Sequence, residues 1–356
     1  MKDFLSSRPP SGRSRLRRKI PVLGAILLLL AVLTAGCGVK QKSRYTASFL
    51  TLFDTVTSIV GYAENEEAFT REVNRIHDEL EAYDHLYNIY REYPGTVNLR
   101  TVNLHPGEIL KVDRRIIDLL VFAREADLFS GHRVDAMLGS VLSLWHEARE
   151  EGIQNPAEAY LPDENALREA RKHTGFDLIE IDEENCTVRL LDGQAQLDVG
   201  ALAKGYAVQR ICENIPEGYL ISVGGNVVST GPKPDGTAWT VGVQDPEGDG
   251  QTYLHKLSLF KGAVVTSGDY QRLYYVNGSA YHHIIDPETL YPGTKWRAVT
   301  VITEDSGIGD ALSTALFLMD QGEGMQLLEK YGAEAVWIQK DGKQLFSPGY
   351  TSCMKP

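Results

Sequence analysis

Asp310 and Thr314, in the segment D-A-L-S-T, form a carboxylate–hydroxyl pair separated by about one helical turn. Residues i and i+4 lie on one face of a helix, and the apolar pattern of residues 310–319 predicts a helix that starts at Asp310. One carboxylate, one hydroxyl and a backbone carbonyl make an oxygen-only site of low charge. Such a site suits Mg²⁺ that also binds substrate phosphate. An aspartate at a helix start can equally be an N-cap, and the spacing alone favours the cap.

A second candidate is the stretch from Leu197 to Ala207, which reads L-D-V-G-A-L-A-K-G-Y-A. Asp198 closes a short apolar run, and the pattern predicts a helix from Ala203 through Ile211. A carboxylate and a glycine at a strand-to-helix turn leave helix N–H groups open, which suits an anionic ligand. The alternative is a glycine turn that only starts a helix.

Three basic side chains are candidates for phosphate contact or proton transfer. His283, in H-H-I-I-D-P, is the best-placed histidine for either role. A structural hydrogen bond is the alternative for a lone histidine. Lys204 is compatible with a phosphate contact or with a solvated helix position, and Arg272 with a surface ion pair.

The first 36 residues have the composition of a secretion leader. A basic segment precedes the apolar run Ile20–Leu33, which is short for a membrane span, and L-T-A-G-C follows, ending at Cys37. Small residues immediately before a cysteine resemble the lipobox of bacterial lipoproteins. We therefore expect a signal peptide over 1–36, a lipid on Cys37 and an extracytoplasmic, lipid-anchored body. An uncleaved N-terminal anchor is the alternative.

The charge balance excludes one class of partner. Residues 1–36 carry seven basic residues and one acidic residue, so their removal takes the formal charge from −12 to −18. A body this acidic is a poor candidate for binding nucleic acid. Lysine and arginine alone are also ill suited to hold an anionic cofactor there, whereas a divalent cation would solve that problem.

The order of predicted elements indicates the fold class. Strands and helices do not alternate strictly, and tight turns join several strands, which favours an α+β fold of mainly antiparallel sheets with packed helices. We expect a tether over 37–48 and one domain over 49–350. Within it, residues 218–230 predict a buried strand with Gly224-Gly225-Asn226 at its tip. The scattered Cys186, Cys212 and Cys353 indicate buried or free thiols.

Eight motifs along residues 45–350 together resemble the ApbE family of FAD:protein FMN transferases. In chain order they are F-D-T, Y-N-I-Y-R-E-Y-P-G with T-V-N, V-D-A-M-L-G-S-V-L-S-L-W-H, D-V-G-A-L-A-K-G-Y-A, V-G-G-N, T-S-G-D-Y-Q-R, H-H-I-I-D-P-E-T and D-A-L-S-T-A. The resemblance implies an ApbE-like fold that binds FAD as substrate together with Mg²⁺. It also implies transfer of FMN, through its phosphate, onto a Thr or Ser hydroxyl of an acceptor protein, with release of AMP.

The resemblance also implies roles for individual residues. The metal would lie between the backbone oxygen of Ala201, the carboxylate of Asp310 and the hydroxyl of Thr314. The FAD contacts would come from Phe53, Val134, Asp135, Asp198, Lys204, His283 and Ile284. For the catalytic base, His283 and Asp310 both stay open.

The implied partners are acceptor subunits of membrane redox complexes that carry a D-G-x-T-G-A-T-like segment, reached from a lipid anchor at the membrane. Two other functions stay open. One is an Mg²⁺-dependent FAD pyrophosphatase that gives FMN and AMP, with water in place of the acceptor hydroxyl. The other is a lipoprotein that binds flavin without chemistry, against which the presence of both Asp310 and Thr314 argues.

Overall fold

The computed structural model describes residues 42–50, 52–248, 250 and 252–355, and residues 42–356 form one compact unit. The expected signal peptide over 1–36 and the expected lipidation site Cys37 lie outside the described residues. None of the helices described between residues 42 and 355 has both the length and the hydrophobicity needed to cross a membrane.

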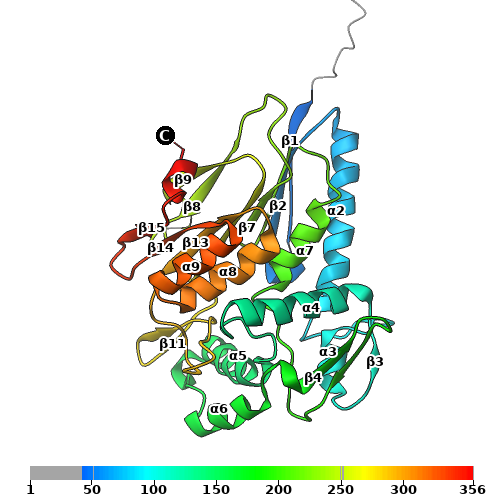
Figure 1. Cartoon of the computed structure of the whole chain (residues 1–356), viewed down its shortest axis with the longest axis vertical. Coiled ribbons are helices and arrows are strands. Elements are labelled where there is room, and N and C mark those ends of the chain that lie inside the picture. Colours follow the sequence, from blue (N-terminus) through cyan, green and yellow to red (C-terminus); the bar gives the residue numbers. More distant parts are fainter. Residues whose placement is uncertain (1–41, 51, 249, 251, 356) are drawn as a thin grey trace, which may run out of the picture. The chain divides into compact units, whose positions relative to one another are not determined.

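An eight-stranded antiparallel sheet organises this unit (Figure 1). Its strand order is β1-β2-β6-β7-β10-β13-β14-β15. The strands are β1 (Ser43–Leu50), β2 (Val56–Ala63), β6 (Tyr219–Val223), β7 (Asn226–Ser229), β10 (Gly262–Gly268), β13 (Ala298–Thr303), β14 (Glu334–Ile338) and β15 (Gln344–Phe346).

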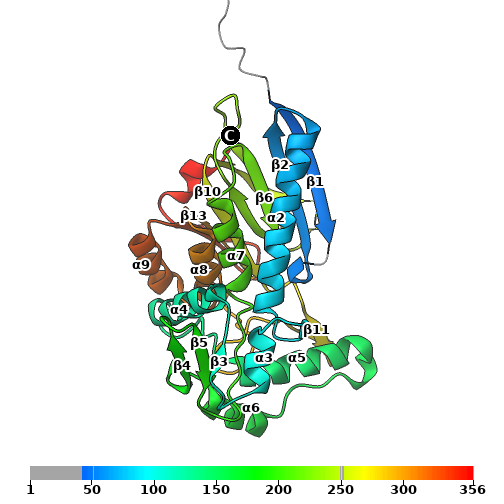
Figure 2. The ribbon, with the colours of Figure 1, turned by 90° about the vertical axis from the view of Figure 1, so that its right-hand side faces the viewer.

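The two faces of this sheet are covered differently. Helices α2 (Glu66–Tyr87), α7 (Ala203–Cys212) and α8 (Ser306–Leu318) pack on one face, as Figure 2 shows for α2 and α7. The hairpin of β8 (Trp239–Gln244) and β9 (Tyr253–Leu259) packs on the other face, against β10 and β14. The hairpin therefore covers the middle and the β14 side of its face, and the β1–β2 side lies beyond it.

The remaining elements gather mainly at one end of the sheet (Figures 1 and 2). They include a three-stranded sheet of order β3-β5-β4 and the hairpin β11–β12. Their bounds are α3 (Leu99–Leu104), β3 (Leu110–Lys111), α4 (Arg114–Phe129), α5 (Gly139–Gln154), α6 (Glu164–Ala170), β4 (Ile179–Asp182), β5 (Thr187–Leu190), β11 (Tyr274–Val276), β12 (Ser279–Tyr281) and α9 (Gln321–Tyr331). Short 3-10 helices are η1 (Leu52–Asp54), η2 (Pro156–Glu158), η3 (Arg171–His173), η4 (Phe176–Leu178) and η5 (Tyr350–Cys353).

The predicted α+β fold with mainly antiparallel sheets is confirmed, but two boundaries are wrong. The expected tether over 37–48 is wrong for 43–48, because Ser43 to Leu50 form β1 and pair along the whole of β2. The exposed face of this edge strand is mostly polar, which gave it the look of a linker. Helix α8 starts at Ser306 with Asp305 as its N-cap, accepting from the Ile308 N–H at 2.9 Å. Asp310 is thus in the second turn and is not a cap.

Three glycines allow the turn and the close approach on which the site depends. Gly224 and Gly225 form the β6–β7 turn with φ of 53° and 96°, values that glycine adopts without steric cost. Gly205 lies where α7 crosses α8. A Cβ there would meet the Ser306 carbonyl oxygen and stand 2.5 Å from Asp310 Cβ.

We predict that Gly205→Ala destabilises the protein by about 1–3 kcal/mol, because the added methyl group has to push two backbones apart. Helix propensity alone would give the opposite sign, a gain of about 1 kcal/mol. The measurement is urea unfolding followed by circular dichroism. Gly322→Ala in α9 is the matched control, since an added Cβ there meets nothing within 4 Å. Equal stability of the two variants would contradict the assigned crossing.

Candidate active site

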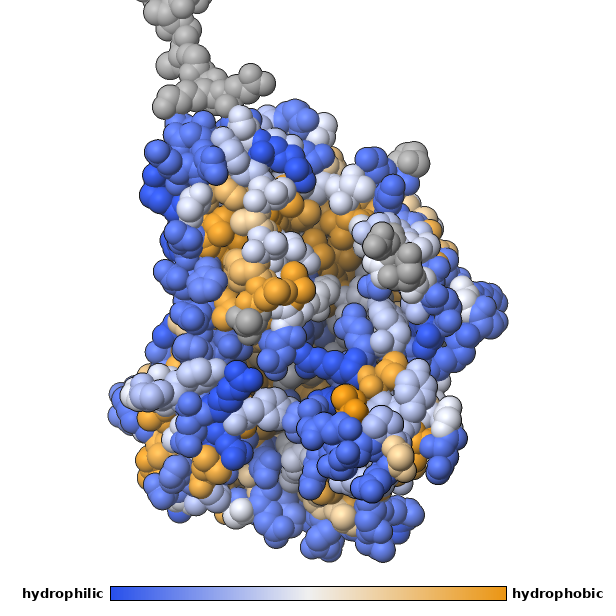
Figure 3. Space-filling model, turned by 180° about the vertical axis from the view of Figure 1, so that it is seen from behind, coloured by the Kyte–Doolittle hydropathy of each residue, from blue (hydrophilic) through white to orange (hydrophobic). Residues whose placement is uncertain are grey.

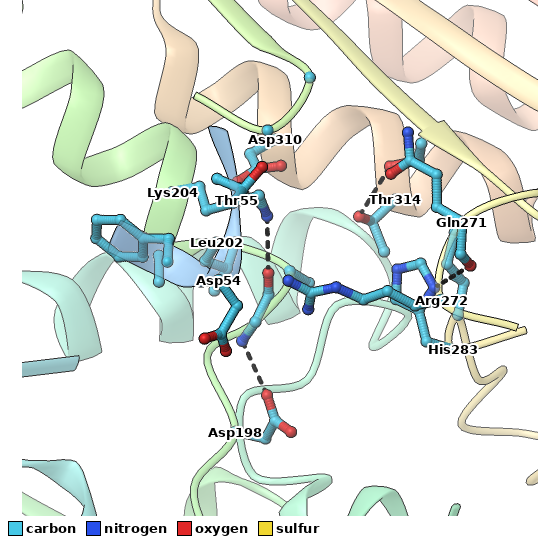
Figure 4. A pocket seen from close by; sticks show the side chains of 18 of the residues that line it. Asp54, Thr55, Asp198, Leu202, Lys204, Gln271, Arg272, His283, Asp310 and Thr314 are labelled. Carbon is cyan, nitrogen blue, oxygen red and sulfur yellow. Dashed lines mark hydrogen bonds and ion pairs between the residues drawn. The ribbon is translucent and has the colours of Figure 1, made fainter. Parts of the chain in front are cut away.

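A cavity of about 800 Å³ lies where the main sheet meets the elements at its end. The α7 start, the α8 face, the β6–β7 turn, the start of β2 and the segments 266–272 and 281–285 all contribute to its wall. Every expected metal, substrate and catalytic residue lines it: Phe53, Val134, Asp135, Asp198, Ala201, Lys204, His283, Ile284, Asp310 and Thr314. Segments more than 250 residues apart in sequence therefore meet in one space (Figure 4).

The two candidate segments, residues 197–207 and the Asp310–Thr314 stretch of α8, are in direct contact. The Gly205 N–H donates to Asp310 Oδ2 at 2.8 Å, and Asp310 is only 5% exposed. Lys204 Nζ lies 3.8 Å from the same oxygen. Because α7 starts at Ala203, the Gly205 N–H does not bond to the Ala201 carbonyl four residues earlier. That carbonyl oxygen is left without its regular helical partner beside a buried carboxylate.

Thr314 lies one turn after Asp310, and its hydroxyl also faces the cavity wall. Its Oγ1 lies 3.4 Å from Ser267 Oγ, which is itself 2.9 Å from Ser313 Oγ. A carboxylate oxygen, a hydroxyl and a free backbone carbonyl are hard oxygen donors, and they fit Mg²⁺ that keeps several waters. Among the described residues no group of three or more His, Cys, Asp or Glu side chains could hold a metal. A metal here would thus rely on a single carboxylate.

The charges along the cavity wall argue for a further cation. Five carboxylates line it: Asp54, Asp84, Asp135, Asp198 and Asp310. Four cationic side chains line it: Arg133, Arg149, Lys204 and Arg272. A pyrophosphate would bring further negative charge beside Asp310, and a divalent ion would offset it.

Arg272 is a cation whose side chain extends into this space. Its side chain extends between Asp310 and Asp198 in Figure 4, and the surface ion pair considered from the sequence is not found among the described residues. Its backbone has φ of 47°, an unfavourable value for a residue with a side chain. This strained position aims an unpaired guanidinium into the cavity, which suits contact with phosphate oxygens.

His283 is held as a neutral imidazole. Its Nδ1 lies 3.2 Å from the Gln271 carbonyl oxygen, which can only accept, so Nδ1 carries the proton and Nε2 keeps its lone pair. Burial, together with the positive charges of Arg272 and Lys204, lowers the pKa of His283 to about 3. The neighbouring His282 has a structural role, because its Nε2 bonds to the Gly293 carbonyl oxygen and its Nδ1 accepts from the Ile284 N–H.

Two further carboxyls on the wall have raised pKa values. Burial raises the pKa of Asp135 to about 6, although its carboxylate accepts from the Met137 N–H. Burial also raises the pKa of Asp198, whose Oδ1 accepts from the Gly200 N–H at 2.8 Å. Both groups are therefore ready to protonate when a further negative charge comes near.

Strained backbone marks the wall at the start of β2. Phe53 and Asp54 have φ of 52° and 51°, and the Phe53 N–H donates to Asp84 Oδ1 at 3.1 Å. Two successive residues with side chains in this conformation cost free energy that the surrounding structure has to offset. The strain turns the side chains of residues 53–55 to the cavity.

The sequence analysis missed several residues of the wall. Asn226 is 1% exposed and its Nδ2 has no partner, yet it lines the cavity beside Asp310. The motif V-G-G-N contained its signal, since a two-glycine turn fixes where the next side chain points. Tyr90 and His146 stack with ring centroids 4.6 Å apart at the α5 end of the cavity. No spacing pattern connects residues this far apart.

Comparison with known proteins places the chain in a family. The sequence model of the ApbE family matches residues 53–337. The chain is 32% identical to the FAD:protein FMN transferase of Treponema pallidum, over 70% of this chain and 73% of that protein. It is 28% identical to the FAD:protein FMN transferase of Klebsiella pneumoniae, over 75% of this chain and 82% of that protein.

A solved structure has the same fold. The crystal structure of the ApbE protein of Thermotoga maritima aligns with a TM-score of 0.77 and 28% identity, covering 88% of this chain and 100% of that chain. The expected ApbE-like α+β fold is thereby confirmed. Since the family match spans most of its length, the chain belongs to the ApbE family.

Proposed function

We propose that this protein transfers the FMN part of FAD to a Thr or Ser hydroxyl of an acceptor protein and releases AMP. The observation that carries the proposal is the contact of Asp310 with the Gly205 N–H inside the cavity, beside the free Ala201 carbonyl and Thr314. This donor set suits an ion that binds a pyrophosphate. The relatives named FAD:protein FMN transferase support the same reaction.

The transfer replaces a phosphoanhydride bond at phosphorus with a phosphate ester bond. The acceptor hydroxyl oxygen forms a bond to the FMN phosphorus, and the pyrophosphate bond to the AMP oxygen breaks. The hydroxyl proton passes to a base, and AMP leaves with the bridging oxygen and its electron pair. Phosphoryl chemistry of this kind depends on charge neutralisation and positioning more than on covalent catalysis.

The residues of the chain divide this work. Ala201, Asp310 and Thr314 would hold Mg²⁺, which when bound neutralises phosphate charge. Lys204 and Arg272 contact phosphate oxygens with fixed positive charge. His283, neutral and with Nε2 unprotonated, accepts the hydroxyl proton, and Asp310 is the other candidate base. Phe53, Val134, Asp135, Asp198 and Ile284 contact the remainder of FAD.

The proposed setting is extracytoplasmic. A signal peptide over 1–36 would direct export. A lipid on Cys37 would anchor the protein to the membrane. Acceptor subunits of membrane redox complexes would be within reach there. Retention of the purified chain in the detergent phase of a Triton X-114 separation, lost in Cys37→Ala, would support the anchor.

The reaction is tested by mixing the chain with FAD, Mg²⁺ and a domain that carries a D-G-x-T-G-A-T-like segment. We expect flavin fluorescence on the acceptor band of a denaturing gel, with one AMP per labelled acceptor. Free FMN and AMP without a labelled acceptor would identify a pyrophosphatase. Unchanged, bound FAD would identify a flavin-binding protein without this chemistry.

Asp310→Asn should lower the transfer rate by about a thousandfold, as expected for loss of a main electrostatic contribution to phosphoryl transfer. The amide oxygen can still accept from the Gly205 N–H, so the change removes charge and keeps the helix crossing. Thr314→Val should also impair transfer, whereas Thr314→Ser keeps a hydroxyl and should retain most of it. Near-normal rates in Asp310→Asn would contradict the metal assignment.

His283→Gln should lower the transfer rate about a hundredfold or more, the usual contribution of a general base. The exposed His105→Gln is the control and should leave the rate unchanged. Because the pKa of His283 is lowered to about 3, the imidazole stays unprotonated as the pH falls from 8 to 5. Any inflection of the transfer rate near pH 6 should therefore come from Asp135, whose pKa is about 6, and should vanish in Asp135→Asn. Survival of the inflection in that variant would contradict the low pKa of His283.

A further inference from the structure

One part of the main sheet is left uncovered beside the cavity. The β8–β9 hairpin packs over β10 and β14, with Leu220 and Val227 partly beneath it. Beyond its edge lie Val56, Ser58 and Val60 of β2 and Ser222 of β6, which are exposed or half-buried. Seen from behind, this face carries an apolar hollow between the β1 side and the β8–β9 hairpin (Figure 3). We call it the sheet trough, and its floor is formed by Val56, Ser58, Val60, Leu220, Ser222 and Val227.

The trough is built from ordered rows of side chains. Strand pairing places Val60 opposite Leu220, and Ser58 opposite Ser222. Because paired residues share a face of the sheet, an apolar pair and a hydroxyl pair lie side by side on β2 and β6, and Val227 of β7 continues the row of Ser58 and Ser222. Val56, which is 50% exposed, begins a further apolar row. Alternating apolar and hydroxyl rows can contact both the side chains and the backbone of an extended peptide.

The trough leads into the cavity. Val56, Ser58 and Ser222 belong to both, since they also line the wall that Asp310 shares. At the other end, the rings of Tyr62 and Trp239 pack with centroids 5.8 Å apart. The four steps along β2 from Val60 to Val56 span about 13 Å, which matches about five residues of an extended peptide.

We propose that the sheet trough docks an extended segment of the acceptor protein and delivers its hydroxyl to the cavity. The inference rests on the proposed function, which requires a protein hydroxyl to enter the cavity that holds FAD. Continuity of the trough with that cavity is what selects this occupant. A bilayer would need a convex or flat patch, preferably with basic residues, whereas this surface is hollow and has serines along its centre.

The test is a change at Val60, which lies in the trough and outside the cavity wall. In Val60→Lys the charge enters the apolar row, and the KM for a domain bearing a D-G-x-T-G-A-T-like segment should rise tenfold or more. The rate at saturating acceptor and the Kd for FAD, measured by flavin fluorescence, should stay within twofold. Val60→Thr keeps the shape and β propensity and should raise the KM less.

Ile109→Lys is the matched control, because Ile109 is 68% exposed before β3 and outside both trough and cavity. An unchanged KM in Val60→Lys, equal to that of the control, would overturn the proposal. A weakened Kd for FAD would overturn it as well, by assigning the trough to FAD.

Two other occupants are separate outcomes of the same variants. Loss of binding to phosphatidylcholine–phosphatidylglycerol vesicles with an unchanged KM would assign the trough to a membrane, and dissociation of a dimer with an unchanged KM would assign it to a second copy. Either result overturns the docking of an acceptor. A wild-type chain that binds FAD and labels no acceptor contradicts the proposed function itself, and acceptor docking falls with it.

Discussion

The close crossing of α7 and α8 is the constraint on which the site depends. Glycine at position 205 lets the two backbones approach until the N–H of one helix reaches the carboxylate of the other, at 2.8 Å. That bond fixes Asp310 in a site only 5% exposed and at the same time removes the regular partner of the Ala201 carbonyl. Glycine at this position thus places the Asp310 carboxylate and the Ala201 carbonyl, an anionic and a neutral oxygen donor, in the same place. A larger residue at position 205 would separate them.

Burial of titratable side chains in the cavity wall sets the charges of the cavity. Five carboxylates line the cavity, and burial raises the pKa values of two of them, Asp135 and Asp198. The same burial keeps His283 neutral, so that its proton-accepting nitrogen is available across the physiological range. In the proposed reaction, this site would combine a divalent ion with a base that stays unprotonated.

The arrangement of layers decides how a large acceptor could approach. Helices α2, α7 and α8 pack on one face of the main sheet, which leaves the opposite face as the approach. There the β8–β9 hairpin contacts β2 at the far end, where Trp239 packs on Tyr62, while Val56, Ser58 and Ser222 next to the cavity stay exposed or half-buried. Exposed sheet of this kind normally risks association with other chains. In this fold it lies where a second protein would have to bind for the proposed reaction.

The amino-acid sequence by itself determined the fold class, the i, i+4 pair of Asp310 and Thr314, and the local motifs that mark the family, because periodicity and turn residues act over short range. It misplaced the start of α8, where Asp305 and not Asp310 is the cap, since several acids near a helix start compete for that role. It also took the edge strand β1 for a tether, because one face of an edge strand is polar. Only the tertiary structure decided that Gly205 and Asp310 touch, that Arg272 points inward without an ion-pair partner, and that Asn226 lines the same cavity. Those contacts join segments far apart in the chain, and their geometry comes from the packing of whole helices on the sheet, which no local pattern encodes.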